Sequence, residues 1–167
     1  MIQKSNYKFY MQQYPTTDAE GTTTVVKDLQ ADFKGLAYKS MSGIENYGKP
    51  NVYTEKFAES EKLSVYIPSA YVFEQTDLVL TLYFFGDADL GITGTKTSRD
   101  YYHDFMGYVK GKHLLYWDDA RKRKALMYLS DSTTPTTDTI YGVPYIEVQF
   151  KFKNEYGHSF DVTETVK

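Results

Sequence analysis

Residues 146–153 alternate apolar and polar side chains without a break, and this pattern constrains the fold more than any other part of the chain. The polar positions hold one glutamate, one glutamine and two lysines, and the apolar positions are Ile146, Val148, Phe150 and Phe152. Successive side chains of a β-strand point to opposite faces of the sheet. The alternation therefore predicts a strand with one face in a hydrophobic core and the other in water.

Other segments extend this sheet. Residues 63–67 alternate leucine, valine and isoleucine with serine and tyrosine and stop at a proline, which predicts another strand. Residues 78–85 are apolar at nearly every position, so we expect both faces to be buried, as in a central strand. Residues 112–117 and 125–129 flank a charged turn and predict a hairpin. Between residues 31 and 60, glycines and a proline at short intervals predict short strands joined by turns.

One segment shows helical spacing instead. Ser98 and Asp100 suit a helix N-terminus, and Gly111 suits the position just past a C-terminus. Between them, apolar residues recur every three or four positions, at Tyr101, Tyr102, Phe105, Met106 and Val109. These signals predict a helix over residues 98–110 whose apolar stripe packs on the sheet.

The fold class follows from the balance of these elements. Strand patterns dominate, and one helical stripe accompanies them. We predict a mainly β (α+β) fold, an antiparallel β-sandwich or barrel with one flanking α-helix near residues 98–110. Phe105 and Phe150 each lie in the middle of an apolar face, so we expect both in the shared core.

The first 30 residues differ from the rest of the chain. Tyr7, Phe9 and Met11 alternate with polar residues and predict a short strand, and the TTDAEGTTT sequence that follows has the composition of a linker. We expect an N-terminal arm and flexible linker over residues 1–30, and a single β-rich domain over residues 31–167. Such an arm brings its apolar side chains onto a neighbouring subunit. The alternative is a strand that folds back onto the chain's own sheet.

The turn of the predicted hairpin is strongly charged. Its sequence, DDARKRK, places two aspartates ahead of four basic residues, and burying an unpaired charge is costly. We therefore expect this turn to contact a neighbouring subunit, and we expect reversal of its two arginine charges to leave the chain folded. The interface candidates are Asp118, Asp119, Arg121, Lys122, Arg123 and Lys124.

Residues that carry chemistry are sparse or wrongly spaced. There are no cysteines, and the three histidines form no HxH or HxxxH pair, so a thiolate or histidine metal site has no local support. Asp87, Asp89 and Gly91 have the DxDxG spacing of a calcium loop but lack its third oxygen ligand and its final glutamate. Glycine-rich phosphate loops and the GxSxG nucleophile motif are absent. We predict no enzyme activity, no cofactor and no metal site.

Charge and composition narrow the class of partner. The net charge of −3 does not indicate specific nucleic-acid recognition. The longest apolar run is far shorter than the roughly 20 residues of a membrane span. Seventeen tyrosines and ten phenylalanines are unusual for 167 residues. Tyrosine suits both the wet edges of a β-rich core and protein–protein interfaces, so composition leaves these two interpretations open.

The order of elements from residue 63 onward resembles tail proteins of tailed bacteriophages, of the distal-tail and tail-tube type. In that family a helix is followed by a Gly-Lys pair, a strand, an acidic turn and a second strand, and later by a strand of the pattern E-V-x-F-x-F. The resemblance covers about residues 60–160. The matching residues here are Gly111 and Lys112, Asp118 and Asp119, and Glu147, Val148, Phe150 and Phe152.

The resemblance implies a virion structural protein, made in the bacterial cytoplasm, that forms a homo-oligomeric ring in the tail and contacts neighbouring tail proteins. A tail-completion (terminator) protein, a class that usually opens with helices, or another head–tail connector is the alternative within this group. Two alternatives from other classes stay open. One is a carbohydrate- or receptor-binding β-sandwich that stacks sugars on Trp117, and the other is an enzyme built on scattered carboxylates such as Asp87, Asp89 and Asp118.

Overall fold

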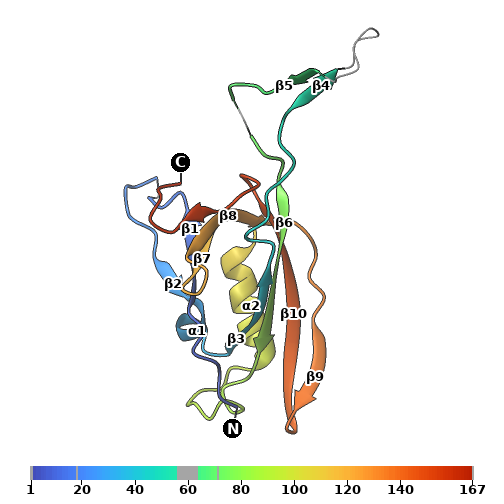
Figure 1. The fold of residues 1–167 in the computed structure, drawn as a ribbon. Helices are drawn as coiled ribbons and strands as arrows, with labels where there is room; N and C mark the ends of the chain where they lie inside the picture. Colours follow the sequence, from blue (N-terminus) through green and yellow to red (C-terminus); the bar gives the residue numbers. More distant parts are fainter. Residues whose placement is uncertain (1, 18, 56–63, 71, 167) are drawn as a thin grey trace.

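The computed structural model describes residues 2–17, 19–55, 64–70 and 72–166. Within these ranges the chain forms eleven strands and two helices (Figure 1). In chain order they are β1 (Phe9–Tyr14), β2 (Val26–Asp28), α1 (Leu29–Asp32), β3 (Leu36–Ser42), β4 (Tyr53–Glu55), β5 (Ser64–Tyr66), β6 (Thr76–Phe84), α2 (Ser98–Val109), β7 (His113–Asp118), β8 (Arg123–Leu129), β9 (Thr136–Ile140), β10 (Val143–Asn154) and β11 (Phe160–Asp161).

Nine of these strands form one antiparallel sheet. The order is β2-β1-β7-β8-β10-β6-β3, with β11 beside β8 and β9 beside β10. The predicted mainly β class is confirmed. The sheet curls but stays open, so of the predicted architectures the closed barrel is not formed.

The longest pairing in the sheet joins β6 and β10, which run side by side over nine residue pairs. In β10 the even-numbered residues from 146 to 154 are buried, and the odd-numbered residues between them are partly or fully exposed. This is the predicted one-sided burial. In β6, Leu78, Leu80, Leu82 and Phe84 are fully buried, and Thr81 on the opposite face is also buried. Val79 and Tyr83 on that face are half-buried and Asp77 is exposed, so the predicted burial is complete on one face of β6 and only partial on the other.

Helix α2 lies within one residue of its predicted span, but its N-cap is Thr97 instead of Ser98. The Thr97 hydroxyl accepts a hydrogen bond from the Asp100 backbone N–H at 3.3 Å, and the Asp100 carboxylate accepts one from the Thr97 N–H at 2.9 Å. This reciprocal pair is a capping box, which satisfies two backbone donors that the first turn leaves free.

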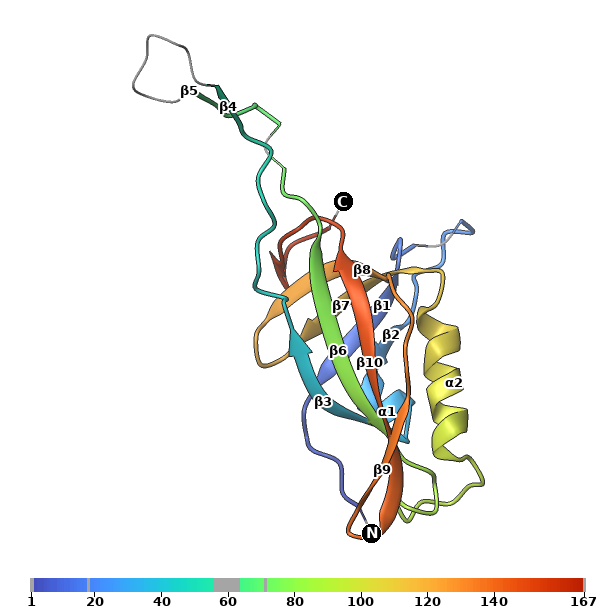
Figure 2. The same ribbon diagram turned by 90° about the vertical axis from the view of Figure 1, so that its right-hand side faces the viewer.

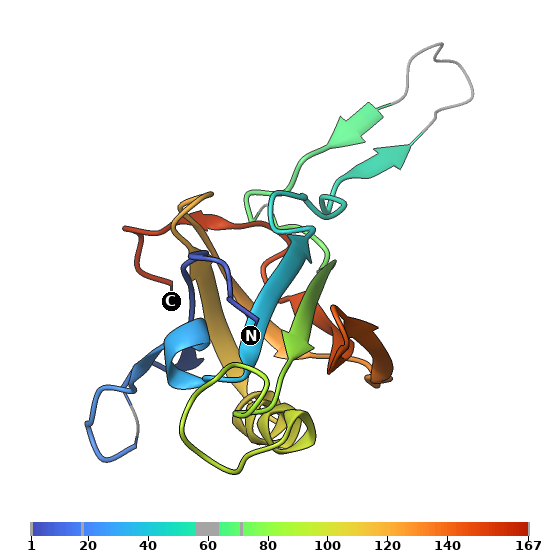
Figure 3. The ribbon, with the colours of Figure 1, turned by 90° about the horizontal axis from the view of Figure 1, so that it is seen from below.

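The core lies between α2 and the concave face of the curled sheet (Figures 2 and 3). Its buried residues come from β1, β3, β6, β7, β8 and β10 and from both helices. Phe105 and Phe150 have no exposed surface, and their rings meet edge to face with centroids 4.9 Å apart. The prediction that these two residues share one core is confirmed.

Side chains bridge the two ends of the open sheet. Gln30 in α1 is buried, and its Nε2 donates to the Tyr7 carbonyl at 2.6 Å, while its Oε1 accepts from the Tyr38 N–H at 3.1 Å. The Tyr7 ring stacks on the Tyr38 ring with centroids 3.9 Å apart. The segment before β1 is thereby fixed to β3, although β1 and β3 are not neighbours in the sheet.

The predicted N-terminal arm needs correction. β1 pairs with β7 along six residues, and β2 pairs with the other edge of β1. Phe9 and Met11 have no exposed surface because they lie in the chain's own core. The alternative of a strand folded back on its own sheet is the one the structure adopts, so the division at residue 30 is not a domain boundary. The TTDAEGTTT sequence is an exposed connection between β1 and β2 in its described residues.

The projecting part of the molecule is instead the hairpin of β4 and β5, which form a separate two-stranded sheet. Figures 1 and 2 show it extending away from the nine-stranded sheet. The strand predicted over residues 63–67 corresponds to β5, and Leu63 lies outside the described residues. It was predicted as a strand that extends the main sheet, but β5 pairs only with β4, and the described apolar side chains of this segment are exposed.

Candidate assembly surface

The β4–β5 hairpin exposes more apolar surface than its own two strands can bury. Five of its side chains, or of the chain just after it, are 56–67% exposed: Tyr53, Val65, Tyr66, Ile67 and Val72. The Tyr53 and Tyr66 rings lie across the hairpin with centroids 6.3 Å apart. A two-stranded hairpin alone is at best marginally stable in water. Large exposed apolar groups gathered on one element are typical of a surface that binds another protein.

The base of this hairpin is firmly attached to the rest of the molecule. The Glu74 N–H donates to the Lys49 carbonyl at 2.8 Å, and the Gly48 N–H donates to the Gly157 carbonyl at 2.7 Å. Asn51 closes the two chains at this point, because its side chain donates to the Ala70 carbonyl at 2.9 Å and accepts from the Val72 N–H at 2.8 Å. The hairpin is therefore held in a projecting position by hydrogen bonds at its base.

Close backbone approach at this base requires glycine. A Cβ on Gly48 would lie 1.8 Å from the Glu74 carbonyl oxygen, well inside contact distance. Around the glycines, Phe73 and His158 pack their rings together at 5.4 Å, and the Tyr47 ring lies 5.3 Å from Phe73. This aromatic group joins the hairpin base to the turn after β10.

The predicted interface turn between β7 and β8 binds its own chain instead. Asp118 is buried and accepts hydrogen bonds from the Arg121 backbone N–H at 2.6 Å and from Arg121 Nη1 at 2.9 Å. Arg121 Nη2 donates to the Met41 carbonyl at 2.8 Å, which ties the turn to β3. A buried carboxylate is tolerated here because a guanidinium and a backbone donor both compensate it.

The other charged residues of the turn divide into two groups. Arg123 donates to the Ser159 hydroxyl at 2.9 Å and to the Ser159 carbonyl at 2.7 Å, and Lys124 donates to the Val162 and Glu164 carbonyls. These two hold the C-terminal segment against β8. Asp119 and Lys122 remain exposed, although the Tyr10 hydroxyl donates to Asp119 at 3.2 Å.

The predicted interface candidates are therefore not brought together as one surface. Phe9 and Met11 are in the core, and Asp118, Arg121, Arg123 and Lys124 serve intramolecular contacts. Tyr7 is half-buried against Tyr38. The sequence reasoning missed the exposed hairpin residues because their alternation looks like that of a core strand. The sequence does contain one signal of this exposure. Val65, Tyr66 and Ile67 are consecutive, so they place apolar or aromatic side chains on both faces of a very short strand, and the segment that contains them is flanked by Pro50 and Pro68.

The candidate calcium loop is occupied by its own hydrogen bonds. Asp87 is buried, and its carboxylate accepts from the Tyr101 hydroxyl and from the Lys96 N–H at 3.0 Å. Burial and the neighbouring Asp87 carboxylate raise the pKa of Tyr101, which keeps that hydroxyl a donor. The Asp89 carboxylate accepts a hydrogen bond from the Gly86 N–H at 3.4 Å. Among the described residues, no group of three or more histidine, aspartate or glutamate side chains is arranged to hold a metal ion.

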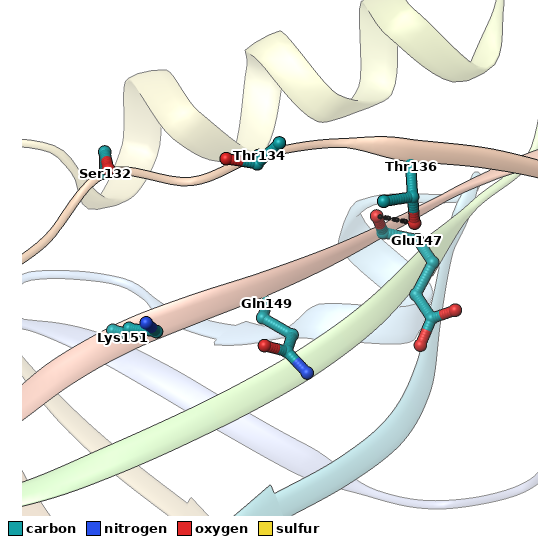
Figure 4. A pocket seen from close by; sticks show the side chains of 6 residues that line it. All are labelled: Ser132, Thr134, Thr136, Glu147, Gln149 and Lys151. Atoms are coloured by element: carbon teal, nitrogen blue, oxygen red, sulfur yellow. Dashed lines mark hydrogen bonds between the residues drawn. The ribbon is translucent and has the colours of Figure 1, made fainter.

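A polar recess lies between β10 and the segment that leads into β9 (Figure 4). It has a volume of about 380 Å³ and is lined by Ser132, Thr134, Thr136, Glu147, Gln149 and Lys151. The Thr136 hydroxyl donates to the Glu147 carbonyl at 3.3 Å across one end of it. No lining side chain is aromatic or aliphatic, and ligand sites are mostly lined by such groups. One face of the Trp117 ring is covered by the Tyr10 ring, which stacks on it with centroids 5.7 Å apart, so a sugar could not stack on that face.

No family model matches the chain, and no curated protein matches it. Within the described ranges, neither helix has the length and apolar composition that crossing a membrane requires.

Proposed function

We propose that this chain is a structural component of a bacteriophage virion that forms an oligomeric ring in the tail through protein–protein contacts. The observation that carries the assembly role is the projecting β4–β5 hairpin with its five exposed apolar side chains. The phage assignment rests on the resemblance of residues 60–160 to tail proteins.

The energetics favour assembly through this element. Fully burying one large apolar side chain contributes about 1.5–3 kcal/mol. Five of them together are of the same order as the cost of association, about 4–15 kcal/mol. Tyrosine is one of the residue types enriched among the side chains that anchor protein interfaces, and two of the five are tyrosines.

The shape of the contact indicates a ring more than an isolated dimer. A hairpin that projects from one side and inserts into a different surface of the next copy makes a heterologous contact. Heterologous contacts between identical subunits continue until they close into a ring or extend as a filament. The β-strands in the first 42 residues favour a distal-tail or tail-tube type of protein over a terminator, since terminators usually open with helices.

Removing the hairpin tests the proposal. Residues 51–72 can be replaced by a short Gly-Ser-Gly turn, which removes the Asn51 bonds but keeps the Pro50–Phe73 bridge and the hydrogen bond from the Glu74 N–H to the Lys49 carbonyl. We expect the shortened chain to keep its circular dichroism spectrum and thermal transition but to be monomeric by native mass spectrometry at concentrations where the full chain is oligomeric. The matched control is Val25→Ser, which removes an equally exposed apolar residue elsewhere.

Two outcomes contradict the proposal. One is a shortened chain that assembles like the full chain. The other is a full chain that stays monomeric at every concentration and binds a glycan array in a way that Trp117→Ala abolishes, which favours the carbohydrate-binding alternative.

A further inference from the structure

We draw no further inference here: the strongest candidate, the apolar recess of about 230 Å³ between Ile2, Leu90 and Ile92, carries nothing, because the Lys4 ammonium that lines it already donates to the Gln30 carbonyl and nothing in the described part of the structure shows what covers it.

Discussion

β1 and β5 are both short segments of alternating apolar residues beside polar linkers, yet one lies in the core and the other projects into water. Phe9 and Met11 in β1 have no exposed surface, whereas Val65 and Tyr66 in β5 are each more than half exposed. The comparison teaches that alternation identifies a strand but does not identify the surface that will bury it.

The difference arises from pairing. β1 has partners on both edges, with six residue pairs to β7 and three to β2. β5 has three pairs to β4 only and no place in the nine-stranded sheet. Cross-strand neighbours are the unit of sheet stability, so a strand paired on both edges is fixed by its own chain, and a short one-sided strand depends on what lies outside.

The largest difference in stability between the two regions is expected when one aromatic ring is truncated in each. Phe9→Ala removes a fully buried ring and should lower the free energy of unfolding by about 3–5 kcal/mol. Tyr66→Ala removes an exposed ring and should change it by less than about 0.5 kcal/mol. Chemical denaturation of the monomer at neutral pH measures both. A loss below about 1 kcal/mol for Phe9→Ala would show that β1 is not held in the core.

Much of the sheet was predictable because its signal is local. The alternation of residues 146–153 and the double-sided apolar run of residues 78–85 each contain enough positions to define a buried face. Helix α2 was predictable from its stripe, and only its cap shifted to Thr97, since serine and threonine caps are nearly equivalent by residue type. The contacts of Gln30 and Tyr38 with Tyr7, which bridge the two ends of the open sheet, join residues far apart in the sequence, and no local pattern encodes them.

The β7–β8 turn offers a second comparison, between two basic residues one position apart. Arg121→Glu removes the guanidinium that compensates buried Asp118 and adds a like charge, so we expect a loss of about 2–3 kcal/mol in unfolding free energy. Lys122→Glu alters an exposed side chain and should change it by less than about 0.5 kcal/mol. Thermal unfolding of the two variants in parallel measures the difference. Equal stabilities would mean that the turn is as solvated as its sequence suggests.

This turn also shows why the candidate site was the harder part to predict. A run of charges in the sequence indicates solvent or a partner, because burial of charge is rare. Asp118 is an exception that depends on Met41 and Arg121 being brought together by the fold, 80 residues apart in the sequence. The exposed hairpin is the opposite exception, with apolar residues outside. The burial of Asp118 and the exposure of the hairpin residues were both missed for the same reason, because residue type alone was used to predict which side chains are buried.

The smallest effect on stability at neutral pH is expected at Tyr116, a buried tyrosine in the core of the nine-stranded sheet. Its ring is fully buried, and within the described part of the chain its hydroxyl has no hydrogen-bond partner. Tyr116→Phe removes an unpaired buried polar atom without changing the packed ring, so at pH 7 we expect stability to stay equal or to rise by up to about 1 kcal/mol. Tyr53→Phe, at an exposed ring of the hairpin, should leave the monomer's stability at pH 7 unchanged within about 0.5 kcal/mol.

Alkaline pH makes this last difference measurable. Burial, reinforced by the Asp118 carboxylate, raises the pKa of Tyr116 above its ordinary value near 10. The folded state then holds a proton that the unfolded state releases above about pH 10, so this contribution to stability is complete below pH 10 and falls as the pH rises further. Between pH 10 and 11 the parent should lose up to about 1.4 kcal/mol more than Tyr116→Phe, as measured by urea unfolding at each pH. Parallel pH profiles for the two proteins would place the Tyr116 hydroxyl in contact with water and would contradict the burial on which this comparison between body and hairpin depends.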